Sequence, residues 1–419
     1  MNTIPADLDS IASSIAFAWI QSEVHKKPAV PLIQIQRDDF TLRAENVYAL
    51  GLAGVDKPQE QLLTLSDLED TKPFPSQRFA LVDHNRLGHS FVLDNPTYQV
   101  VAVVDHHDDE GLYRETANPR TIAPAGSCTS HIASLCPSEV PPELATLLLC
   151  GILIDTSGLK PRGKALPVDY DAAGYIVPKS TFAPSLPPKL FAALSEDPKC
   201  KTDAIYEAPA IKDLTRTLSA KKSDLSHLTG WDLLRRDYKE YEYTLAWAPN
   251  TPSIKAGLST VPVGLEQWGL DGKLEEAVTK WMKHRDLTIF GALTSFKAVK
   301  KSGLSGKQKH RREMAWFVRE DLEKRAGENS VGDGEVPQGL DYSELAARLW
   351  KGLEESPEIK VKKHKKINLE KGGKLPEGTK ARVYNQQKVD ATRKVTAPLL
   401  KSILESPATA PAPAESGKK

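Results

Sequence analysis

Two kinds of hydrophobic pattern alternate along the first 160 residues. Residues 79–82 and 100–104 are short, β-branched, fully apolar runs, which are typical of buried parallel strands. Apolar residues at helical spacing occupy 11–19, and a longer apolar stretch over 143–154 follows two prolines that suit a helix start. Because strand-like and helix-like segments alternate, the sequence predicts an α/β domain with a largely parallel sheet.

The composition changes further along the chain. Residues 160–228 are rich in proline and mixed in pattern, and we expect them to hold one or two helices and the interdomain connection. A new block begins near Trp231, with a helical stretch over 274–283 and a strand-like run over 287–293. We therefore expect a first domain over 1–195, a connection over 196–228, a second, smaller α/β domain over 229–404 and a disordered tail over 405–419. The tail is expected because Ser, Pro, Ala, Gly and charged residues cannot form a core.

Bulk properties narrow the class of protein. A chain of 419 residues favours two domains, and its net charge of +1 argues against binding nucleic acid through overall charge. No apolar run is long enough to span a membrane, and Asp7 and Asp9 interrupt the layout of a signal peptide. Four cysteines without a CxxC pair indicate reduced thiols. We expect a cytoplasmic protein, with the nucleus left open, and neither a nucleic-acid nor a membrane partner.

Acidic residues and histidines cluster at four places in the first 155 residues. The clusters are Asp7 and Asp9, Asp83-His84-Asn85, Asp105-His106-His107, and Asp155. Two of them follow predicted parallel strands, whose carboxyl ends meet at one edge of a sheet, so we expect these side chains to converge. Carboxylates and imidazoles without thiolates suit Mn²⁺ or Mg²⁺, and cations would offset the repulsion between the carboxylates. A single Asp after a strand is more often a turn residue or helix cap, but four clusters together favour a metal site.

These motifs, in this order, resemble the DHH phosphoesterase superfamily. The resemblance is strongest to the branch with a DHHA2 domain, which contains manganese-dependent inorganic pyrophosphatases, fungal exopolyphosphatases and prune proteins. The segments that carry it are 6–11, 82–85, 104–107, 126–130, 153–156, 384–386, 392–394 and Pro398. It covers most of the chain and implies a DHH domain followed by a DHHA2-like domain.

The resemblance also implies roles for individual residues around two ions, Mn²⁺ or Mg²⁺. Asp83 would bridge the ions and be essential for catalysis. Asp7 would bind one ion, and Asp9, His106 and Asp155 the other. His107 would contact the substrate phosphate or assist the leaving group, and Asp105 would orient a histidine. Arg393 and Lys394 in the second domain would also bind the substrate. Ser127 would bind it too, because it lies in a loop of small residues, 126–130, just before a helix.

One position departs from the family pattern. The family places a Gly and then a His or Asn before the first motif, with the His or Asn four residues ahead of the first Asp. Here that position is Thr3, and Asn2 lies five residues ahead. This indicates either a start further upstream or an altered metal site.

Two basic stretches bear on the substrate. Residues 297–312 hold seven Lys and Arg without an acid, and 360–374 hold seven Lys against one Glu. Such stretches are often only a solvated surface, but they would also attract a long polyanion. The sequence therefore favours an exopolyphosphatase acting on inorganic polyphosphate. The alternatives are a manganese-dependent pyrophosphatase and a prune-like binding protein with weak or no hydrolysis.

Overall fold

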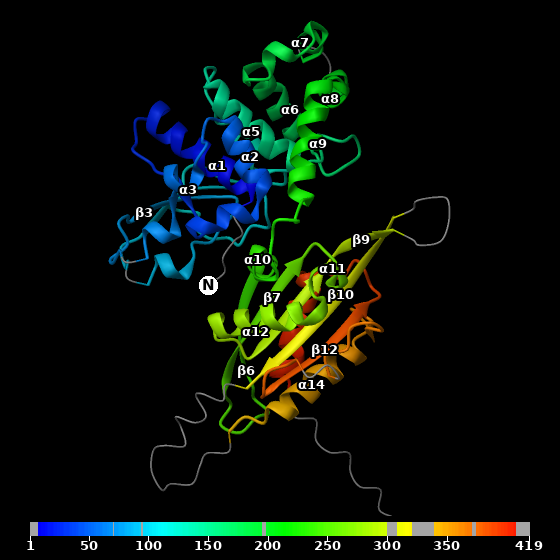
Figure 1. The fold of residues 1–419 in the computed structure, drawn as a ribbon. Helices are drawn as coiled ribbons and strands as arrows, with labels where there is room; N and C mark the ends of the chain where they lie inside the picture. Colours follow the sequence, from blue (N-terminus) through cyan, green and yellow to red (C-terminus); the bar gives the residue numbers. More distant parts are fainter. Residues whose placement is uncertain are drawn as a thin grey trace, which may run out of the picture. The chain divides into compact units, whose positions relative to one another are not determined.

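The computed structural model describes residues 7–69, 71–93, 95–194, 198–299, 308–320, 339–370 and 374–407. The chain forms two compact units, Met1–His227 and Leu228–Lys419 (Figure 1). Asn2 and Thr3, on which the departure from the family pattern depends, lie outside the described residues. Within the described ranges, every helix is too short or too polar to cross a membrane.

The first unit contains the predicted parallel sheet. Strands β3 (Arg78–Val82), β4 (Gln99–Asp105) and β5 (Arg120–Ile122) lie in this order, and both neighbouring pairs are parallel. A separate parallel pair is formed by β1 (Leu32–Ile33) and β2 (Leu63–Thr64). The α/β class and the two predicted strands are therefore confirmed.

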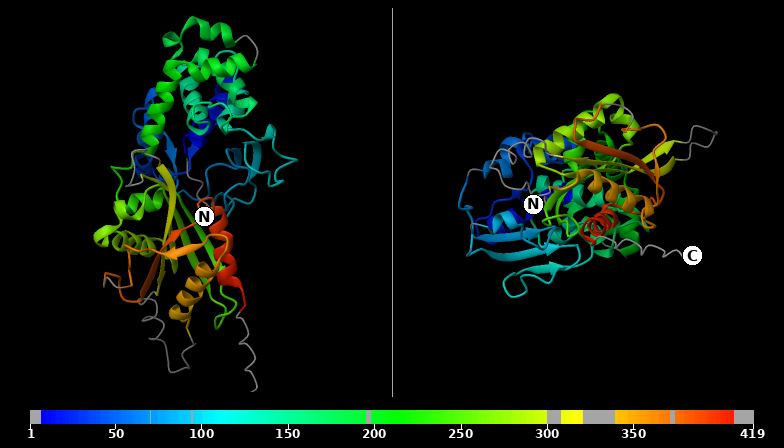
Figure 2. Two further views of the ribbon diagram at one scale, coloured as in Figure 1. Left: turned by 90° about the vertical axis from the view of Figure 1, so that its right-hand side faces the viewer. Right: turned by 90° about the horizontal axis from the view of Figure 1, so that it is seen from below.

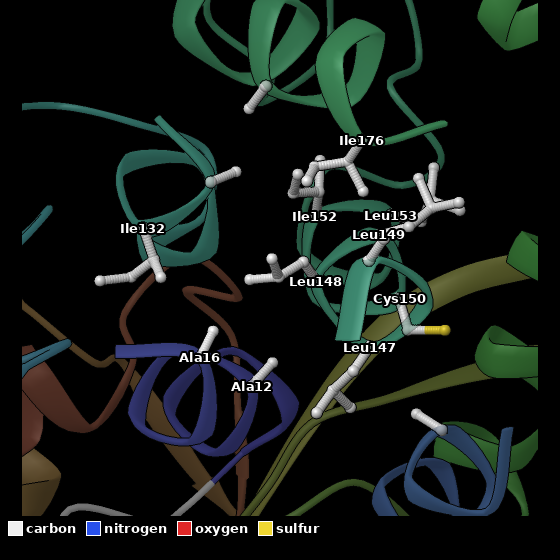
Figure 3. Close-up of a cluster of buried hydrophobic side chains, with 14 of the residues drawn as sticks. Ala12, Ala16, Ile132, Leu147, Leu148, Leu149, Cys150, Ile152, Leu153 and Ile176 are labelled. Carbon is white, nitrogen blue, oxygen red and sulfur yellow. The ribbon is translucent and has the colours of Figure 1, made fainter. Parts of the chain in front are cut away.

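Helices α1 (Leu8–Trp19) and α5 (Pro142–Asp155) form the centre of the first core. Almost all of α5 is buried, as expected for a helix that is apolar on every side. Helix α1 packs against α5, and Figure 3 shows its small residues Ala12 and Ala16 beside Leu148 of α5. Helices α2 (Ala44–Leu52), α3 (Pro58–Gln61) and α4 (Cys128–Ala133) complete this part of the unit.

The predicted connection over 196–228 is corrected by the structure. After α6 (Pro167–Ile176) and α7 (Pro188–Leu194), the chain forms α8 (Pro198–Glu207) and α9 (Pro209–Ser223). Ile205, Ile211, Leu214 and Leu218 of these two helices are buried in the first core. The prolines indicated a linker, but each of these four helices begins with one, at the position where a missing N–H costs nothing.

The second unit is built on a mixed sheet. Its strand order is β11-β12-β10-β8-β7-β6, and β9 pairs with β10. Strands β7 and β8 are parallel, and the other pairs are antiparallel. The strands are β6 (Tyr238–Thr244), β7 (Ser253–Val261), β8 (Ile289–Thr294), β9 (Phe296–Val299), β10 (Gln308–Arg319), β11 (Val361–Lys363) and β12 (Thr379–Gln386).

Helices cover both faces of this sheet. Helices α14 (Tyr342–Glu355) and α15 (Arg393–Glu405) pack their apolar side chains on one face. Helices α10 (Gly230–Arg236) and α12 (Lys273–Arg285), with the short α11 (Leu265–Trp268) before α12, lie on the other (Figure 2). The predicted helix over 274–283 and strand over 287–293 correspond to α12 and β8. Of the expected tail, 408–419 lie outside the described residues.

Candidate metal centre

Asp83, His106 and His107 lie together at one edge of the parallel sheet. Asp83 follows β3 directly, the two histidines follow β4, and Val82 is paired with Val104 in the register of these strands. One ligand atom from each of the three residues lies within 4.8 Å of the others. Asp83 Oδ1 is 3.3 Å from His106 Nε2 and 3.8 Å from His107 Nδ1. The strand ends thus bring the two Asp-His motifs together, as the sequence predicted.

The carboxylate of Asp83 is buried, and one of its oxygen atoms has no hydrogen-bond donor, which favours the binding of a cation. Its Oδ2 accepts a hydrogen bond from Ser10 Oγ, whereas its buried Oδ1 has no hydrogen-bond partner. Asp83 also has a positive φ of 64°, a strained conformation that Asp tolerates better than most residues. Burial raises the pKa of Asp83, and the charge of Asp7 adds to this, although His106 and Ser10 oppose it. A buried carboxylate oxygen left without a donor is costly unless a positive charge faces it.

His106 is oriented so that one ring nitrogen faces the carboxylates. Its Nδ1 lies 3.1 Å from the carbonyl oxygen of Ala125, which can only accept a hydrogen bond, so Nδ1 carries a proton and Nε2 is the nitrogen that faces the carboxylates. Burial alone would lower the pKa of His106, but the nearby carboxylates of Asp83 and Asp9 raise it to about 9. The position taken by this extra proton is one that a metal cation could occupy instead.

Asp9 lies behind this pair, against the segment 126–130. Asp9 Oδ2 is 3.9 Å from His106 Nε2 and accepts the N–H of Cys128 at 2.8 Å, while Oδ1 accepts the N–H of Thr129 at 2.8 Å. Burial and the charges of Asp83 and Asp7 raise the pKa of Asp9 to about 6, against the hydrogen bonds from Thr129 and Ser127. Asp9 is therefore suited to bind, together with Asp83, a positively charged ion.

The interpretation of loop 126–130 as a substrate anion site needs correction. The N–H groups of Gly126 and Ser127 donate to Asp169, and those of Cys128 and Thr129 donate to Asp9. The anions at this helix start are thus two carboxylates of the chain itself. Ser127 is fully buried and its Oγ donates to Asp9 Oδ1 at 2.7 Å. It orients a predicted metal ligand here, and its contact with substrate stays a prediction.

Asp7 and Asp155 complete the acidic cluster. Asp7 caps α1, and its Oδ1 accepts the N–H of Ser10, the residue whose hydroxyl donates to Asp83. Asp155 is the last residue of α5, and burial together with the charges of Asp9 and Asp7 raises its pKa to about 6. The five predicted metal ligands are thus close enough to influence one another.

His107 is turned toward solvent by Asp105. The Nδ1 of His107 lies 2.8 Å from Asp105 Oδ1, and this bond raises the pKa of His107 despite partial burial. Asp105 is fully buried and also accepts a bond from Asn85 at 2.5 Å. The predicted orienting role of Asp105 therefore agrees with the structure, and Asn85 is a further member of this network. His84 bonds the carbonyl of Val82 instead and is not part of the three-residue ligand group.

Positively charged side chains lie close together at the start of α15 in the second unit. Arg393 donates to the carbonyl of Asp237 at 2.9 Å and to its Oδ1 at 2.7 Å, and Lys394 is exposed beside it. Lys239 on β6 belongs to the same group, because its pKa is lowered by burial and by the charges of Arg393 and Lys394. Lys239 could not be found from the sequence, because it lies far from Arg393 along the chain and only the packing of β6 against α15 brings the two together.

Comparison with known proteins now identifies the family. A family model for the DHH family, N-terminal domain, matches residues 1–152, and one for the DHHA2 domain matches 216–403. A Schizosaccharomyces pombe protein named as an exopolyphosphatase is 32% identical over 310 residues, which cover 68% of this chain and 70% of that protein. The chain belongs to the DHH family and carries a DHHA2 domain.

Other relatives of this DHH–DHHA2 protein are bacterial. Proteins of Streptococcus suis and Streptococcus agalactiae, named as manganese-dependent inorganic pyrophosphatases, are 33% and 34% identical over 159 and 161 residues. The chain spans 46% of the length of each, and 37% of this chain is covered. A solved Methanococcus jannaschii structure named as a family II inorganic pyrophosphatase has a TM-score of 0.46 and 18% identity, covering 80% of this chain and 92% of that one.

The donor set of the DHH domain fits a divalent cation. It combines the unbonded Oδ1 of Asp83 with further carboxylates and with Nε2 of His106, which can bind a metal once its extra proton is released; these are ligands that Mn²⁺ and Mg²⁺ accept. The choice between the two metals is a prediction. The cytoplasmic location is also a prediction. The three cysteines whose side chains the structure describes are free thiols.

Proposed function

We propose that this protein is a metal-dependent exopolyphosphatase, which hydrolyses the terminal phosphoanhydride bond of inorganic polyphosphate. The observation that carries the proposal is the buried, unbonded Oδ1 of Asp83, 3.3 Å from His106 Nε2, at the centre of a cluster of carboxylates. Such a site is costly to keep without cations. The similar protein from S. pombe, which is named as an exopolyphosphatase, supports polyphosphate as the substrate class.

The residues of the centre divide the work between them. Asp7, Asp9, Asp83, His106 and Asp155 would hold two divalent ions, which when bound lower the pKa of water and neutralise phosphate charge. In the reaction, a water molecule releases one proton to the solvent as its oxygen bonds to the terminal phosphorus, the bridging P–O bond breaks, and the leaving oxygen takes up a proton. His107 suits the last step, because Asp105 holds its Nδ1–H and raises its pKa, which keeps a proton available at Nε2.

Polyphosphate is favoured over pyrophosphate by two observations. The match to the S. pombe protein covers 68% of the chain, whereas the matches to the streptococcal pyrophosphatases cover 37%. In addition, the described parts of the basic stretches place Lys297, Lys309 and Arg311 exposed on β9 and β10. A long polyanion can use such charges, whereas pyrophosphate needs only the metal centre and a few cations. Pyrophosphatase is the second candidate, and the converging ligands argue against a binding protein without hydrolysis.

A substrate panel tests the proposal. The full-length protein with Mn²⁺ or Mg²⁺ is expected to release orthophosphate from long-chain polyphosphate, and KM for the long chains should rise with added KCl because salt screens exposed charges. The measurement is phosphate release from long-chain polyphosphate, tripolyphosphate and pyrophosphate. Release from pyrophosphate alone would move the assignment to pyrophosphatase. No release from any of them by metal-loaded protein would favour the prune-like alternative.

Arg393 is proposed to bind substrate phosphate, and a matched pair of variants tests this. We expect Arg393→Ala to raise KM for polyphosphate by roughly 10-fold, because a guanidinium makes strong, geometrically specific bonds to phosphate. Asp237→Asn removes the ion-pair partner but keeps the guanidinium, so its KM should stay within about threefold of the parent. Both variants should lower the melting temperature, since both disturb the Arg393–Asp237 contact. Equal changes of KM would show that Arg393 is only structural.

A further inference from the structure

Two lysines flank the carboxylate of Asp155. Lys164 Nζ, from the segment between α5 and α6, lies 3.8 Å from Oδ2, and Lys222 Nζ, from the last turn of α9, lies 3.6 Å from Oδ1. The lysine side chains are 55% and 41% exposed, whereas that of Asp155 is 16% exposed. Each carboxylate oxygen therefore has one partly exposed ammonium group as a neighbour.

These ion pairs compete with a metal for the same oxygen atoms. At 3.6 and 3.8 Å they are longer than hydrogen bonds, and half-exposed pairs of this kind contribute little to stability. A divalent ion bound by Asp155 would displace them easily, because its charge is larger and its bonds to carboxylate oxygen are shorter. The lysines would then be left beside the metal centre without their anion.

The charge balance indicates what such lysines would bind. Four carboxylates, those of Asp7, Asp9, Asp83 and Asp155, face two divalent ions in the proposed centre, so that these charges cancel. The two ammonium groups then add an uncompensated positive charge at the solvent side of the centre. The compact charge and flexible stem of lysine suit a group that exchanges one anionic partner for another.

We propose that Lys164 and Lys222 form an anion-binding pair in the DHH domain, which transfers from Asp155 to a phosphate group of the condensed phosphate once divalent cations occupy Asp155. The inference rests on the proposed function, because it takes the metal-loaded centre as the place where the phosphate binds. It adds two substrate ligands from the same domain as the metal centre, beyond Arg393 and Lys394.

Binding of a substrate analogue tests the pair without relying on turnover. The probe is imidodiphosphate, a pyrophosphate analogue with a bridging nitrogen, titrated calorimetrically into the Mn²⁺-loaded full-length protein. Lys164→Gln and Lys222→Gln are each expected to raise its Kd by roughly 10-fold, the size of one lost charge-assisted bond. Lys→Arg at either position should restore most of the affinity. Titration of Mn²⁺ alone should show affinity equal to or tighter than that of the parent, because a competing cation has been removed.

Lys221→Gln is the matched control. Lys221 neighbours Lys222 on α9, but its ammonium group lies over the ring of Tyr48, 5.3 Å from the centroid. The variant makes the same change of net charge, and its Kd for imidodiphosphate should stay within about twofold of the parent.

Two outcomes would overturn the inference. In the first, Lys164→Gln and Lys222→Gln bind imidodiphosphate as the control does. In the second, they lose Mn²⁺ affinity in parallel, which would mean that the lysines support the metal site rather than the phosphate. Either result, with polyphosphate hydrolysis intact, leaves the proposed function standing. Failure of the parent to hydrolyse polyphosphate would count against the proposed function instead, whatever the lysine variants bind.

Discussion

Replacement of Asp83 by asparagine is expected to lower kcat/KM for polyphosphate by on the order of 10³-fold, because the amide cannot supply the charge that holds two cations together. Asparagine has nearly the same shape and also tolerates a positive φ, so the backbone at 64° should be retained. The loss would then report on the metal centre rather than on folding. Initial rates of phosphate release measure it.

The same variant should make the metal-free protein more stable. Burial raises the pKa of Asp83 in the folded state, so the protein binds a proton at this site more tightly than the unfolded chain does. The contribution of such a carboxyl group to stability is fully present below its unfolded pKa and is lost as the pH rises through the folded value. At pH values above the folded pKa of Asp83, the parent has a buried negative charge that lowers its stability, and the variant does not. Its melting temperature in EDTA should exceed that of the parent at pH 7, and the difference should shrink toward pH 4.

Added Mn²⁺ provides the complementary measurement. It should raise the melting temperature of the parent through binding to the folded state, and should raise that of Asp83→Asn much less. Asp213→Asn is the control, since Asp213 is an exposed carboxylate on α9 that pairs with Arg216. It should behave as the parent in every assay. Activity of Asp83→Asn within a few-fold of the parent would rule out Asp83 as the bridging ligand.

Asp169→Ala is expected to destabilise the DHH domain by roughly 3–5 kcal/mol, because it leaves several buried donors without an acceptor. Asp169 is completely buried on α6 and accepts hydrogen bonds from the N–H groups of Gly126 at 2.8 Å and Leu166 at 2.7 Å, and from Ser130 Oγ at 2.6 Å. The segment that it holds is the one whose N–H groups bond Asp9. We therefore expect weaker Mn²⁺ binding as well.

Urea unfolding of the full-length protein measures this effect, with the transition of the DHH domain followed separately because a two-domain chain need not unfold in one step. Asp213→Ala, at an exposed position, should change stability by no more than about 0.5 kcal/mol. Asp169→Asn should be intermediate, since its oxygen still accepts but its NH₂ group faces other donors. If Asp169→Ala unfolds at the same urea concentration as the parent, Asp169 does not hold the segment 126–130 in place.

Local pattern was sufficient for the elements that carry the predicted metal ligands. Strands β3 and β4 and helix α5 follow from uninterrupted apolar runs, although in β3 only Leu81 and Val82 are buried, whereas Phe79 is half-buried and Ala80 is exposed. Parallel pairing then places Asp83 and His106 at one edge without further information. The position of α12 and β8 in the DHHA2 domain follows from the same kind of reasoning.

The amino-acid sequence by itself therefore determined the α/β class, the two-domain organisation and the convergence of the predicted metal ligands, because each depends on local periodicity and on one rule of strand order. Tertiary structure alone decided that α8 and α9 join the first core, that Asp169 and Asp9 occupy the N–H groups of 126–130, and that Lys164 and Lys222 flank Asp155. Contacts such as Asp169 with Gly126 join positions 43 residues apart. A buried polar contact between distant segments leaves no periodic trace, since it depends on where the packed elements place two side chains in space.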